Sequence, residues 1–342
     1  MEMIKNADLK QYSTMRLGGR AAFLIEVSSV EELSSAVKAA KDHQLAFVII
    51  GTGSNIIWRD EGFNGLVIVN RIKGFKIVSD DDVATYIAIG AGEEWDPVVE
   101  RVVSMGLSGI ECLSLIPGTA GATPVQNVGA YGQEIAQTLV SLTAYDTQAD
   151  KLVTLSTSDC SFGYRSSIFN TSASGRYLIV EITLMLSKTK LMPPFYASLA
   201  TYLEQHNITD YGPQTIRNAV MAIRRDKLPD PKVIANNGSF LANPIIDRSL
   251  LTNLEDKYGS VPSWPAGDNQ FKIPAAWLLD RLGYHDYFDA ETGMATWPKQ
   301  SLVFVNKAAK STADLIKFVD KIKRSVKQEF NIDLRQEPLI LP

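Results

Sequence analysis

The chain has 342 residues, of which 45% are hydrophobic and 21% charged, and its formal net charge is -4 at pH 7. These are values of a globular protein that is long enough for two domains. The slight negative charge excludes the basic face of a nucleic-acid-binding protein and electrostatic docking on an anionic membrane. No apolar run approaches the length of a membrane span and the first residues contain no apolar signal core, so we expect no membrane insertion.

Cysteines and histidines are too few and too scattered for several kinds of site. Cys112 and Cys160 lie far apart in sequence, as expected of a protein from a reducing cytoplasm. His43, His206 and His285 each stand alone, which argues against a histidine-ligated metal and against a Ser-His-Asp triad. We therefore expect no metal site, and no phosphate-binding Walker A pattern is present.

The first predicted elements form a small β-α-β lobe. They are a strand at 21–27, a helix at 31–42 that follows a capping box at Ser29 and Glu32, a buried strand at 45–50 and a strand at 65–70. The loop after the buried strand reads Gly51-Thr52-Gly53-Ser54-Asn55, and its backbone N–H groups can form a nest for a diphosphate. A plain turn is the alternative. Ile56 occupies the last glycine position of a dinucleotide fingerprint, so that fingerprint is absent.

The later elements are mixed in order. Strands are predicted at 84–89, 139–145, 152–155, 177–186, 301–306 and about 333–341, and helices at 95–105, 196–205, 213–225 and 274–282. A long amphipathic helix begins at the capping box of Ser311 and Asp314. This order indicates an α+β fold, because helices and strands do not alternate regularly.

The segment 116–132 is the most unusual loop of the chain. It contains four glycines and two prolines, few charges, and neither a helical nor a strand period. Backbone that is irregular and apolar must find hydrogen-bond partners somewhere. A large flat ligand with polar edges, such as a flavin, would supply them; a buried coil that crosses between lobes is the alternative.

The stretch 227–244 is rich in Pro, Gly and Asn. Pro229 and Pro231 stiffen it, and Asn237-Gly238 predicts a tight turn directly before Ser239. A hydroxyl held on such a turn is a candidate for an active site. An ordinary hairpin with a serine that faces water remains the alternative.

Taken together, the motifs resemble the UDP-N-acetylenolpyruvoylglucosamine reductase (MurB) family, in its longer, type I form. The segments that carry the resemblance are 51–55, 116–132, Phe162–Phe169, Pro194–Tyr196, Lys227–Lys232 and Asn237–Phe240. The resemblance implies a two-lobed FAD-binding domain of the PCMH or vanillyl-alcohol-oxidase type, followed by a C-terminal α+β substrate-binding domain. The implied boundaries are 17–190 for the FAD domain, with lobes at about 1–72 and 73–225 and a returning tail at 331–342, and 226–330 for the substrate domain.

The resemblance also implies a reaction. NADPH reduces a non-covalent FAD, and flavin N5 passes hydride to the enolpyruvyl ether of a UDP-sugar, which gives UDP-N-acetylmuramate for peptidoglycan synthesis. The protein would be a bacterial cytoplasmic enzyme and a monomer. Hydride addition leaves negative charge that spreads into the neighbouring carboxylate, so the site needs a proton donor and a carboxylate partner.

The family motifs assign these roles to individual residues. Ser239 matches the proton donor, and Arg165 and Glu337 match the groups that stabilise the enolate. Glu337 stands in an altered context, because Leu334-Arg335-Gln336-Glu337-Pro338 replaces the family's usual Leu-x-Pro-Glu-Val. Expected substrate residues are Tyr196, Lys227 and Asn243, with Arg224 and Gln300 as further candidates. Expected flavin residues are Gly51, Thr52, Gly53, Ser54, Asn55, Gly118, Thr119, Gly121, Ala122, Thr123 and Tyr131.

Two other classes of function remain open from the sequence. An oxidase or dehydrogenase on the same flavin fold would not need the UDP-binding set, and would often tether its flavin through His or Cys. A non-catalytic nucleotide-binding module would bind no flavin and would not depend on Ser239.

Overall fold

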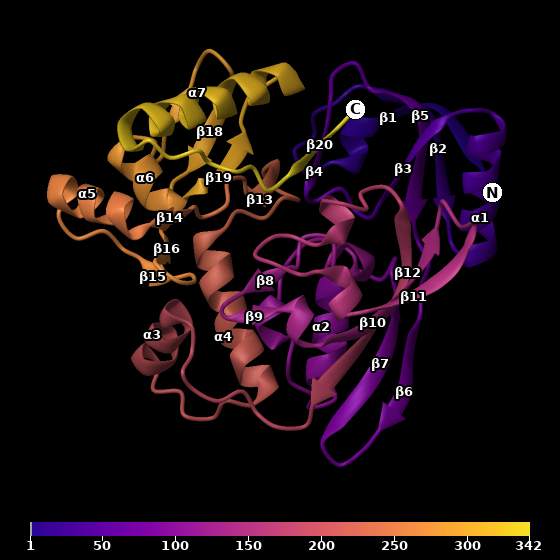
Figure 1. Ribbon diagram of the computed structural model, residues 1–342, viewed down its shortest axis with the longest axis horizontal. Helices are drawn as coiled ribbons and strands as arrows, with labels where there is room; N and C mark the ends of the chain where they lie inside the picture. The colour runs from indigo at the N-terminus through magenta and orange to yellow at the C-terminus, as the bar shows by residue number, and fades with distance from the viewer. Residues whose placement is uncertain (1) are drawn as a thin grey trace. The chain divides into compact units, whose positions relative to one another are not determined.

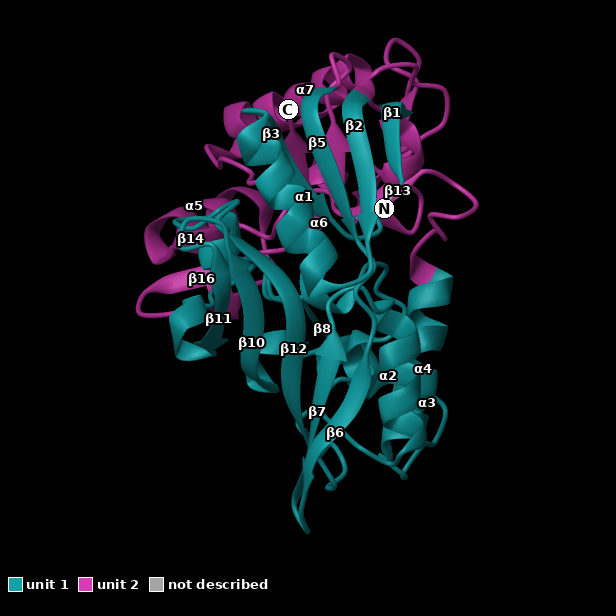
Figure 2. Cartoon of the chain, turned by 90° about the vertical axis from the view of Figure 1, so that its right-hand side faces the viewer, with its two compact units in different colours: residues 1–7, 21–53, 63–226 teal, residues 8–20, 54–62, 227–342 magenta. Residues whose placement is uncertain are grey.

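The computed structural model describes residues 2–342, which form two compact units (Figures 1 and 2). Among these residues, unit 1 holds 2–7, 21–53 and 63–226, drawn in teal in Figure 2. Unit 2 holds 8–20, 54–62 and 227–342, drawn in magenta. Each unit combines helices with strands, which confirms the predicted α+β class.

The first part of unit 1 is a four-stranded sheet in the order β1-β2-β5-β3, in which β5 is parallel to both β2 and β3. Its strands are β1 Met3–Asp8, β2 Arg20–Val27, β5 Phe63–Asn70 and β3 Ala46–Ile50. Helix α1 (Val30–Asp42) packs on this sheet through Leu33, Val37 and Ala40, the face predicted from its periodicity. Only half of the predicted capping box forms. The Ser29 hydroxyl accepts the Glu32 N–H, but the Glu32 carboxylate accepts the N–H of Ser28.

The second part of unit 1 is a five-stranded antiparallel sheet in the order β11-β10-β12-β7-β6. Its strands are β11 Lys151–Ser156, β10 Leu139–Asp146, β12 Tyr177–Ser187, β7 Ala84–Gly90 and β6 Phe75–Asp80. Helix α2 (Trp95–Ser104) fills the core against this sheet with Trp95, Val99 and Val102. A two-stranded ladder joins β8 (Gly129–Ala130) to β9 (Gln133–Glu134).

Helices α3 (Ala197–Gln205) and α4 (Pro213–Lys227) complete unit 1, except that Lys227 already counts with unit 2. They share a small core with Cys112. The buried Arg217 of α4 donates to both carboxylate oxygens of Asp96 on α2, at 2.7 and 3.2 Å. Short 3-10 turns lie at Leu9–Tyr12 in unit 2 and, in unit 1, at Glu111–Leu113, Ala120–Ala122, Ile135–Gln137, Ser158–Cys160 and Ile168–Asn170.

Unit 2 is built on an antiparallel sheet in the order β13-β19-β18-β17, with strands β13 Asn236–Ser239, β19 Gln300–Asn306, β18 Met294–Trp297 and β17 Phe288–Asp289. A second sheet contains β14 Ile245–Asp247, β16 Gln270–Lys272 and β15 Trp264–Pro265. Helices α5 (Arg248–Tyr258), α6 (Ala275–Arg281) and α7 (Thr312–Phe330) surround one core, which contains Phe240, Phe304 and Phe318.

Two early segments of the chain belong to unit 2. Strand β4 (Ile56–Trp58) pairs in parallel with the C-terminal strand β20 (Leu339–Leu341). The Asp60 carboxylate accepts the first N–H groups of α7, from Thr312 at 2.7 Å and Ala313 at 2.8 Å. These bonds fasten the helix N-terminus to the 54–62 segment.

Of two sequence predictions for the last part of unit 2, one is confirmed and the other is wrong in extent. The capping box of Ser311 and Asp314 is confirmed in both directions. The predicted strand at about 333–341 is wrong in extent, because only Leu339–Leu341 form a ladder. The preceding segment turns to a different partner and makes an isolated bridge between Gln336 and Leu241.

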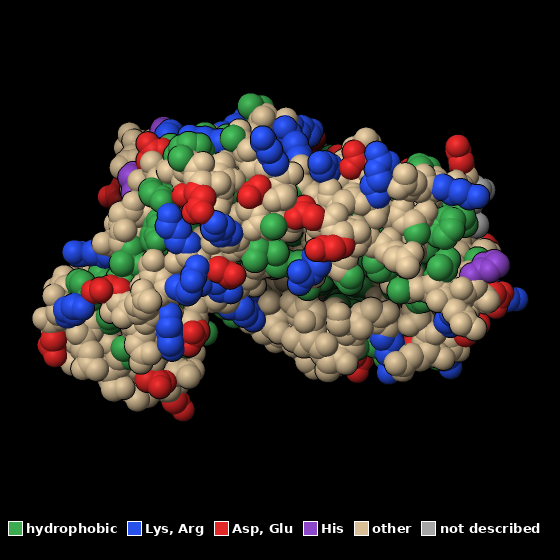
Figure 3. Space-filling view, turned by 90° about the horizontal axis from the view of Figure 1, so that it is seen from above, with side chains coloured by type: hydrophobic (Ala, Val, Ile, Leu, Met, Phe, Trp, Pro, Cys, Tyr) green, Lys and Arg blue, Asp and Glu red, His purple; other side chains and the backbone are tan. Residues whose placement is uncertain are grey.

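The surface seen in Figure 3 carries Lys and Arg side chains interspersed with Asp and Glu, in line with the small net charge. Across residues 2–342, none of the helices has both the length and the apolar character that a membrane crossing would require.

Candidate active site

The loop after β3 lies close to the segment 116–132 within unit 1. A Cβ added to Gly51 would stand 2.5 Å from Oγ1 of Thr119, so only glycine permits this approach. Gly53 has φ +75°, in the left-handed region that favours glycine. The hydroxyl of Thr52 is buried and has no hydrogen-bond partner among residues 2–342.

The segment 116–132 obtains part of its hydrogen bonding from the protein itself. Ala120 donates its N–H to Glu93 O at 2.8 Å, Gly121 donates to Ala91 O at 2.9 Å, and Gly118 O accepts from Trp95. The expectation that a ligand satisfies this backbone is therefore wrong for these groups. The loop 91–95 was not recognised from the sequence as their partner, because it lies far from them along the chain.

An FAD-binding role still fits the residues present in unit 1. The unpartnered Thr52 hydroxyl is a hydrogen-bonding group that a phosphate or ribitol oxygen could engage. The close approach of Gly51 to the side chain of Thr119 brings the two glycine-containing loops together. Backbone N–H groups of such glycine-containing loops are common partners of a nucleotide diphosphate.

Arg165 lies in a tight turn that is anchored to the segment 116–132. Gly163 and Ser166 exchange two backbone hydrogen bonds, at 3.0 and 3.2 Å, around Tyr164 and Arg165. Arg165 has φ +53°, a conformation that is uncommon for residues other than glycine and is found often at functional sites. Its guanidinium donates to Gly129 O at 3.0 Å. The structure thus brings Arg165 together with the predicted flavin segment.

Tyr131, Tyr196 and Arg224 form a second cluster in unit 1. The two tyrosine rings meet edge to face, with centroids 6.0 Å apart. Arg224 donates to Leu115 O at 3.2 Å, while its buried Nε has no partner among residues 2–342. Burial raises the pKa of Tyr131, and the nearby charge of Arg224 acts in the opposite direction. A predicted flavin residue and two predicted substrate residues are therefore neighbours.

The Arg224 side chain is linked to Asp96 through Leu115. Burial opposes ionisation of Asp96, but the hydrogen bonds from Arg217 and from the Leu115 N–H hold its pKa below the ordinary value. Leu115 therefore contacts both Asp96, through its N–H, and Arg224, through its carbonyl. These bonds help to fix the position of the Arg224 side chain.

Ser239 ends strand β13, and its setting differs from the predicted hairpin turn. Asn236 faces Val305 and Ser239 faces Val303 on β19, so β13 contains one extra residue. Gly238 has φ +69° and provides the bulge. The Asn-Gly pair was taken for a turn because its conformational freedom suits both structures.

Glu337 lies beside Ser239 in unit 2. The Glu337 N–H donates to Phe240 O at 2.9 Å, and the Ala242 N–H donates to Arg335 O at 2.9 Å. The residue after Ser239 is thus hydrogen-bonded directly to Glu337. The altered sequence around Glu337 does not prevent this segment from pairing with the one that carries the serine.

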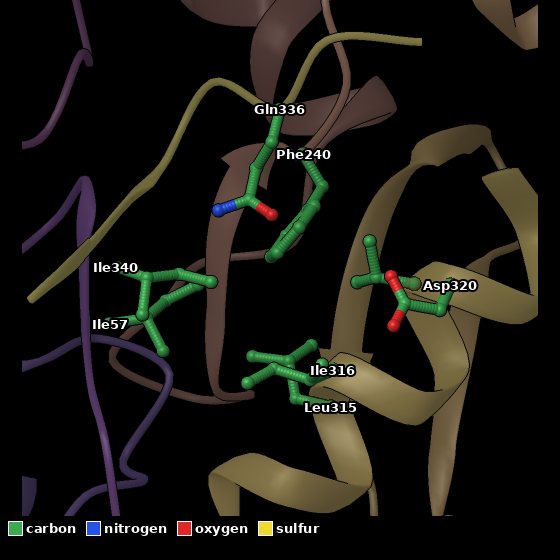
Figure 4. A pocket seen from close by; sticks show the side chains of 8 residues that line it. Ile57, Phe240, Leu315, Ile316, Asp320, Gln336 and Ile340 are labelled. Atoms are coloured by element: carbon green, nitrogen blue, oxygen red, sulfur yellow. The ribbon is translucent and has the colours of Figure 1, made fainter. Parts of the chain in front are cut away.

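A small cavity of about 50 Å³ lies behind this pair of segments (Figure 4). Phe240 and Gln336, the neighbours of Ser239 and Glu337, line it together with side chains of α7. The remaining lining residues are Ile57, Leu315, Ile316, Val319, Asp320 and Ile340.

The other predicted site residues of unit 2 are Ser54, Asn55, Lys227, Asn243 and Gln300. Lys227 is exposed at the end of α4, and Gln300 begins β19 opposite Trp297. The Asn243 side-chain oxygen accepts the Ala275 N–H at 3.0 Å, which caps α6. Ser54 and Asn55 thus fall in a different unit from Gly51, Thr52 and Gly53, although all were predicted to contact the flavin.

Comparison with known proteins matches both halves of the chain. The FAD binding domain family matches residues 21–156, and the family "UDP-N-acetylenolpyruvoylglucosamine reductase, C-terminal domain" matches residues 230–341. The UDP-N-acetylenolpyruvoylglucosamine reductase of Ralstonia nicotianae is 35% identical over 336 residues, covering 97% of each chain. That of Thermobifida fusca is 36% identical, covering 98% of this chain and 97% of its own.

The chain belongs to the UDP-N-acetylenolpyruvoylglucosamine reductase family. A crystal structure of UDP-N-acetylenolpyruvylglucosamine reductase (MurB) from Thermus caldophilus shares its fold, with a TM-score of 0.68 at 21% identity over 100% of this chain and 98% of that one. The predicted family, the FAD-binding fold and the classification as a flavoprotein oxidoreductase are thereby confirmed.

Sequence reasoning missed two residues that hold the segments of the candidate site together. Asn237 was noted for its turn propensity and as part of the segment Asn237–Phe240, but not for its hydrogen bonds, and Asn127 was not singled out. Asn127 donates to Gly163 O at 3.1 Å and so ties the Arg165 turn to the segment 116–132. Both side chains are at least nine-tenths buried, which no local sequence pattern indicates.

Proposed function

We propose that this MurB family member uses NADPH to reduce UDP-N-acetyl-3-O-(1-carboxyvinyl)-glucosamine to UDP-N-acetylmuramate in peptidoglycan precursor synthesis. FAD, when bound, supplies the hydride that adds to the enolpyruvyl methylene carbon. The protein's own task is then to hold the substrate carboxylate, to protonate the neighbouring carbon and to exclude water.

Within this proposal, Ser239 donates the proton. A hydroxyl is a weak acid, but the acceptor is a carbanion and therefore a strong base. Arg165 binds the substrate carboxylate through its guanidinium, and Glu337 in its acid form donates a hydrogen bond to the same charge. The observation that carries the proposal is the direct bond from the Glu337 N–H to Phe240 O, which sets Glu337 beside the segment of Ser239.

The remaining predicted residues hold the two nucleotides. Flavin contacts are proposed for Gly51, Thr52, Gly53, Ser54, Asn55, Gly118, Thr119, Gly121, Ala122, Thr123 and Tyr131, and UDP-sugar contacts for Tyr196, Arg224, Lys227, Asn243 and Gln300. The unpartnered atoms of Thr52 and Arg224 support one contact in each set. The boundaries 17–190 and 226–330 also remain proposals for the flavin and substrate domains.

The cellular setting is a proposal as well. A cytoplasmic location suits the two free thiols, which are both buried. Burial raises the pKa of Cys160 to about 11, so this thiol stays protonated and unreactive at neutral pH. We propose a monomer, which size-exclusion chromatography with light scattering would check.

The test uses the purified full-length protein with FAD. NADPH oxidation is followed anaerobically with and without the enolpyruvyl UDP-sugar, and the product is identified by mass spectrometry. The proposal predicts NADPH consumption that requires this sugar and yields UDP-N-acetylmuramate. Turnover with an unrelated alcohol and none with the UDP-sugar would instead show an oxidase, and failure to bind FAD would contradict the flavin assignment.

A further inference from the structure

Three segments of unit 2 meet around Ser239 and Glu337. They are the β13 segment 236–242, the segment 54–56 that leads into β4, and the C-terminal segment 335–339. The first and third are joined by the Glu337 N–H bond to Phe240 O. The second and third are joined by the Leu339 N–H, which donates to Asn55 O at 3.0 Å.

Two side-chain amides close these bonds into a ring. The Asn55 amide donates to Glu337 O at 3.3 Å. The Asn237 amide donates to Ser54 O at 3.0 Å and to Ile56 O at 3.3 Å. The path from Ser239 through Glu337 and Asn55 therefore returns through Asn237, which is two residues before Ser239.

The fixed orientation of the Asn237 amide is energetically unfavourable for its oxygen. Its nitrogen also lies 3.1 Å from Thr14 Oγ1, so its two hydrogens are shared among three acceptors, which leave one arrangement of the amide. Its oxygen is then buried without a partner among residues 2–342. An unsatisfied buried acceptor destabilises the folded state, so another gain must offset it.

Side-chain packing leaves a gap on one side of the pair, although the buried Phe240 ring stacks on Phe304. The cavity of about 50 Å³ leaves space beside both Phe240 and Gln336 (Figure 4). Each of these residues is next to a proposed catalytic residue in sequence, so the free space gives the two segments room to shift. The ring of hydrogen bonds lies on the same segments and limits that shift.

We infer that Asn55 and Asn237 are positioning residues, which hold Ser239 and Glu337 in the mutual register that substrate protonation requires. This inference rests on the proposed function, because it assigns the two amides to the step that Ser239 and Glu337 perform. It gives Asn55 a role toward Glu337 in addition to any contact with the flavin.

The test measures the two half-reactions of Asn55→Ala and Asn237→Ala by stopped flow. For Asn237→Ala, which is not a proposed flavin contact, we expect flavin content and reduction by NADPH to stay within about twofold of wild type. For both variants we expect re-oxidation by the enolpyruvyl UDP-sugar to slow by about 10- to 100-fold, as misplacement near 1 Å does. The loss should appear in kcat more than in KM. Asn253→Ala, exposed on α5, is the matched control and should behave as wild type.

A double-variant cycle separates positioning from general destabilisation. If Asn55 acts through Glu337, Asn55→Ala should have little further effect in the Glu337→Ala background, which has no side-chain donor at this position. An unchanged effect in that background, or equal slowing of both half-reactions in Asn237→Ala, would overturn the inference. Asn55→Asp keeps the size of the side chain while removing the donor, and serves if an alanine variant does not fold. Absence of re-oxidation in the wild type would instead overturn the proposed function itself.

Discussion

The proposed flavin loops of unit 1 and the Ser239–Glu337 pair of unit 2 are built in opposite ways. In unit 1, loops approach each other because a glycine leaves space, as Gly51 does against Thr119. In unit 2, segments are held by hydrogen bonds between residues far apart in sequence, as Asn55 and Glu337 are, 282 positions apart. The close approach of the unit 1 loops should be disrupted when a methyl group is added at the glycine. The unit 2 segments should be disrupted when a hydrogen bond between them is removed.

Arg165 does not follow this division between the two units. Among the substitutions that test the division, we expect that of Arg165 to have the largest effect, which is on the rate of flavin re-oxidation. It lies in unit 1 beside the flavin segment, but its proposed task is to bind the substrate carboxylate. Arg165→Ala should slow re-oxidation by the UDP-sugar by about 10²- to 10³-fold, because a preorganised charge partner is lost. Flavin content and reduction by NADPH should be unchanged, and Arg225→Ala on the exposed face of α4 is the control. Loss of FAD from Arg165→Ala would place the residue with the flavin loops.

Adding one methyl group at Gly51 should break the unit 1 construction. Its Cβ would lie 2.5 Å from Oγ1 and 3.1 Å from Cγ2 of the buried Thr119. Such overpacking costs about 1–3 kcal/mol, so the dissociation constant of FAD should rise by about 5- to 100-fold. Fluorescence titration with FAD measures this. Gly212→Ala, where the new Cβ would meet its nearest atom at 3.6 Å, should bind FAD as wild type does.

A second substitution sharpens the Gly51 result. Thr119→Ala removes the two atoms that stand closest to the new Cβ, so the pair Gly51→Ala and Thr119→Ala should recover part of the lost affinity. If the double variant binds FAD no better than Gly51→Ala alone, the close approach is not the cause of the loss.

Removing one bonded cap should affect the stability of unit 2. The Asp60 carboxylate accepts two N–H groups at the start of α7, from Thr312 and Ala313. Asp60→Ala should lower the free energy of unfolding by about 1 kcal/mol, the usual loss for such a cap. Urea unfolding measures this against Asp256→Ala, an exposed residue of α5 that accepts no helix N–H. Equal midpoints for the two variants would contradict the capping role.

The smallest expected effect concerns acid stability in unit 1. Arg176 donates to both oxygens of the buried Asp146, and lowers its pKa to about 2. Because this pKa lies below the ordinary value of about 4, the contribution of Asp146 to stability is full above that value and is lost as the pH falls through about 2. Asp146→Asn should therefore lose stability less steeply than wild type over this interval in thermal unfolding. An equally steep decline in both proteins would refute the assignment.

The two regions also differ in how far the sequence predicts them. The glycine-rich loops 51–55 and 116–132 were recognised from composition, and the caps and periodicity of α7 from local pattern. Contacts between distant segments determine the pairing of Glu337 with Phe240. They also determine that residues 8–20 and 54–62 belong to unit 2. Such contacts leave no local period, so Asn237 was interpreted as a turn residue and the end of the chain as one continuous strand.

The most direct test of the account is the pair of half-reactions of Ser239→Ala. NADPH should reduce the bound flavin of this variant at the wild-type rate, because the hydroxyl takes no part in that step. Re-oxidation by the enolpyruvyl UDP-sugar should be slowed by about 10²- to 10⁴-fold, as expected when a general acid is removed. Equal slowing of both half-reactions would show that Ser239 supports the fold of β13 and does not donate the proton.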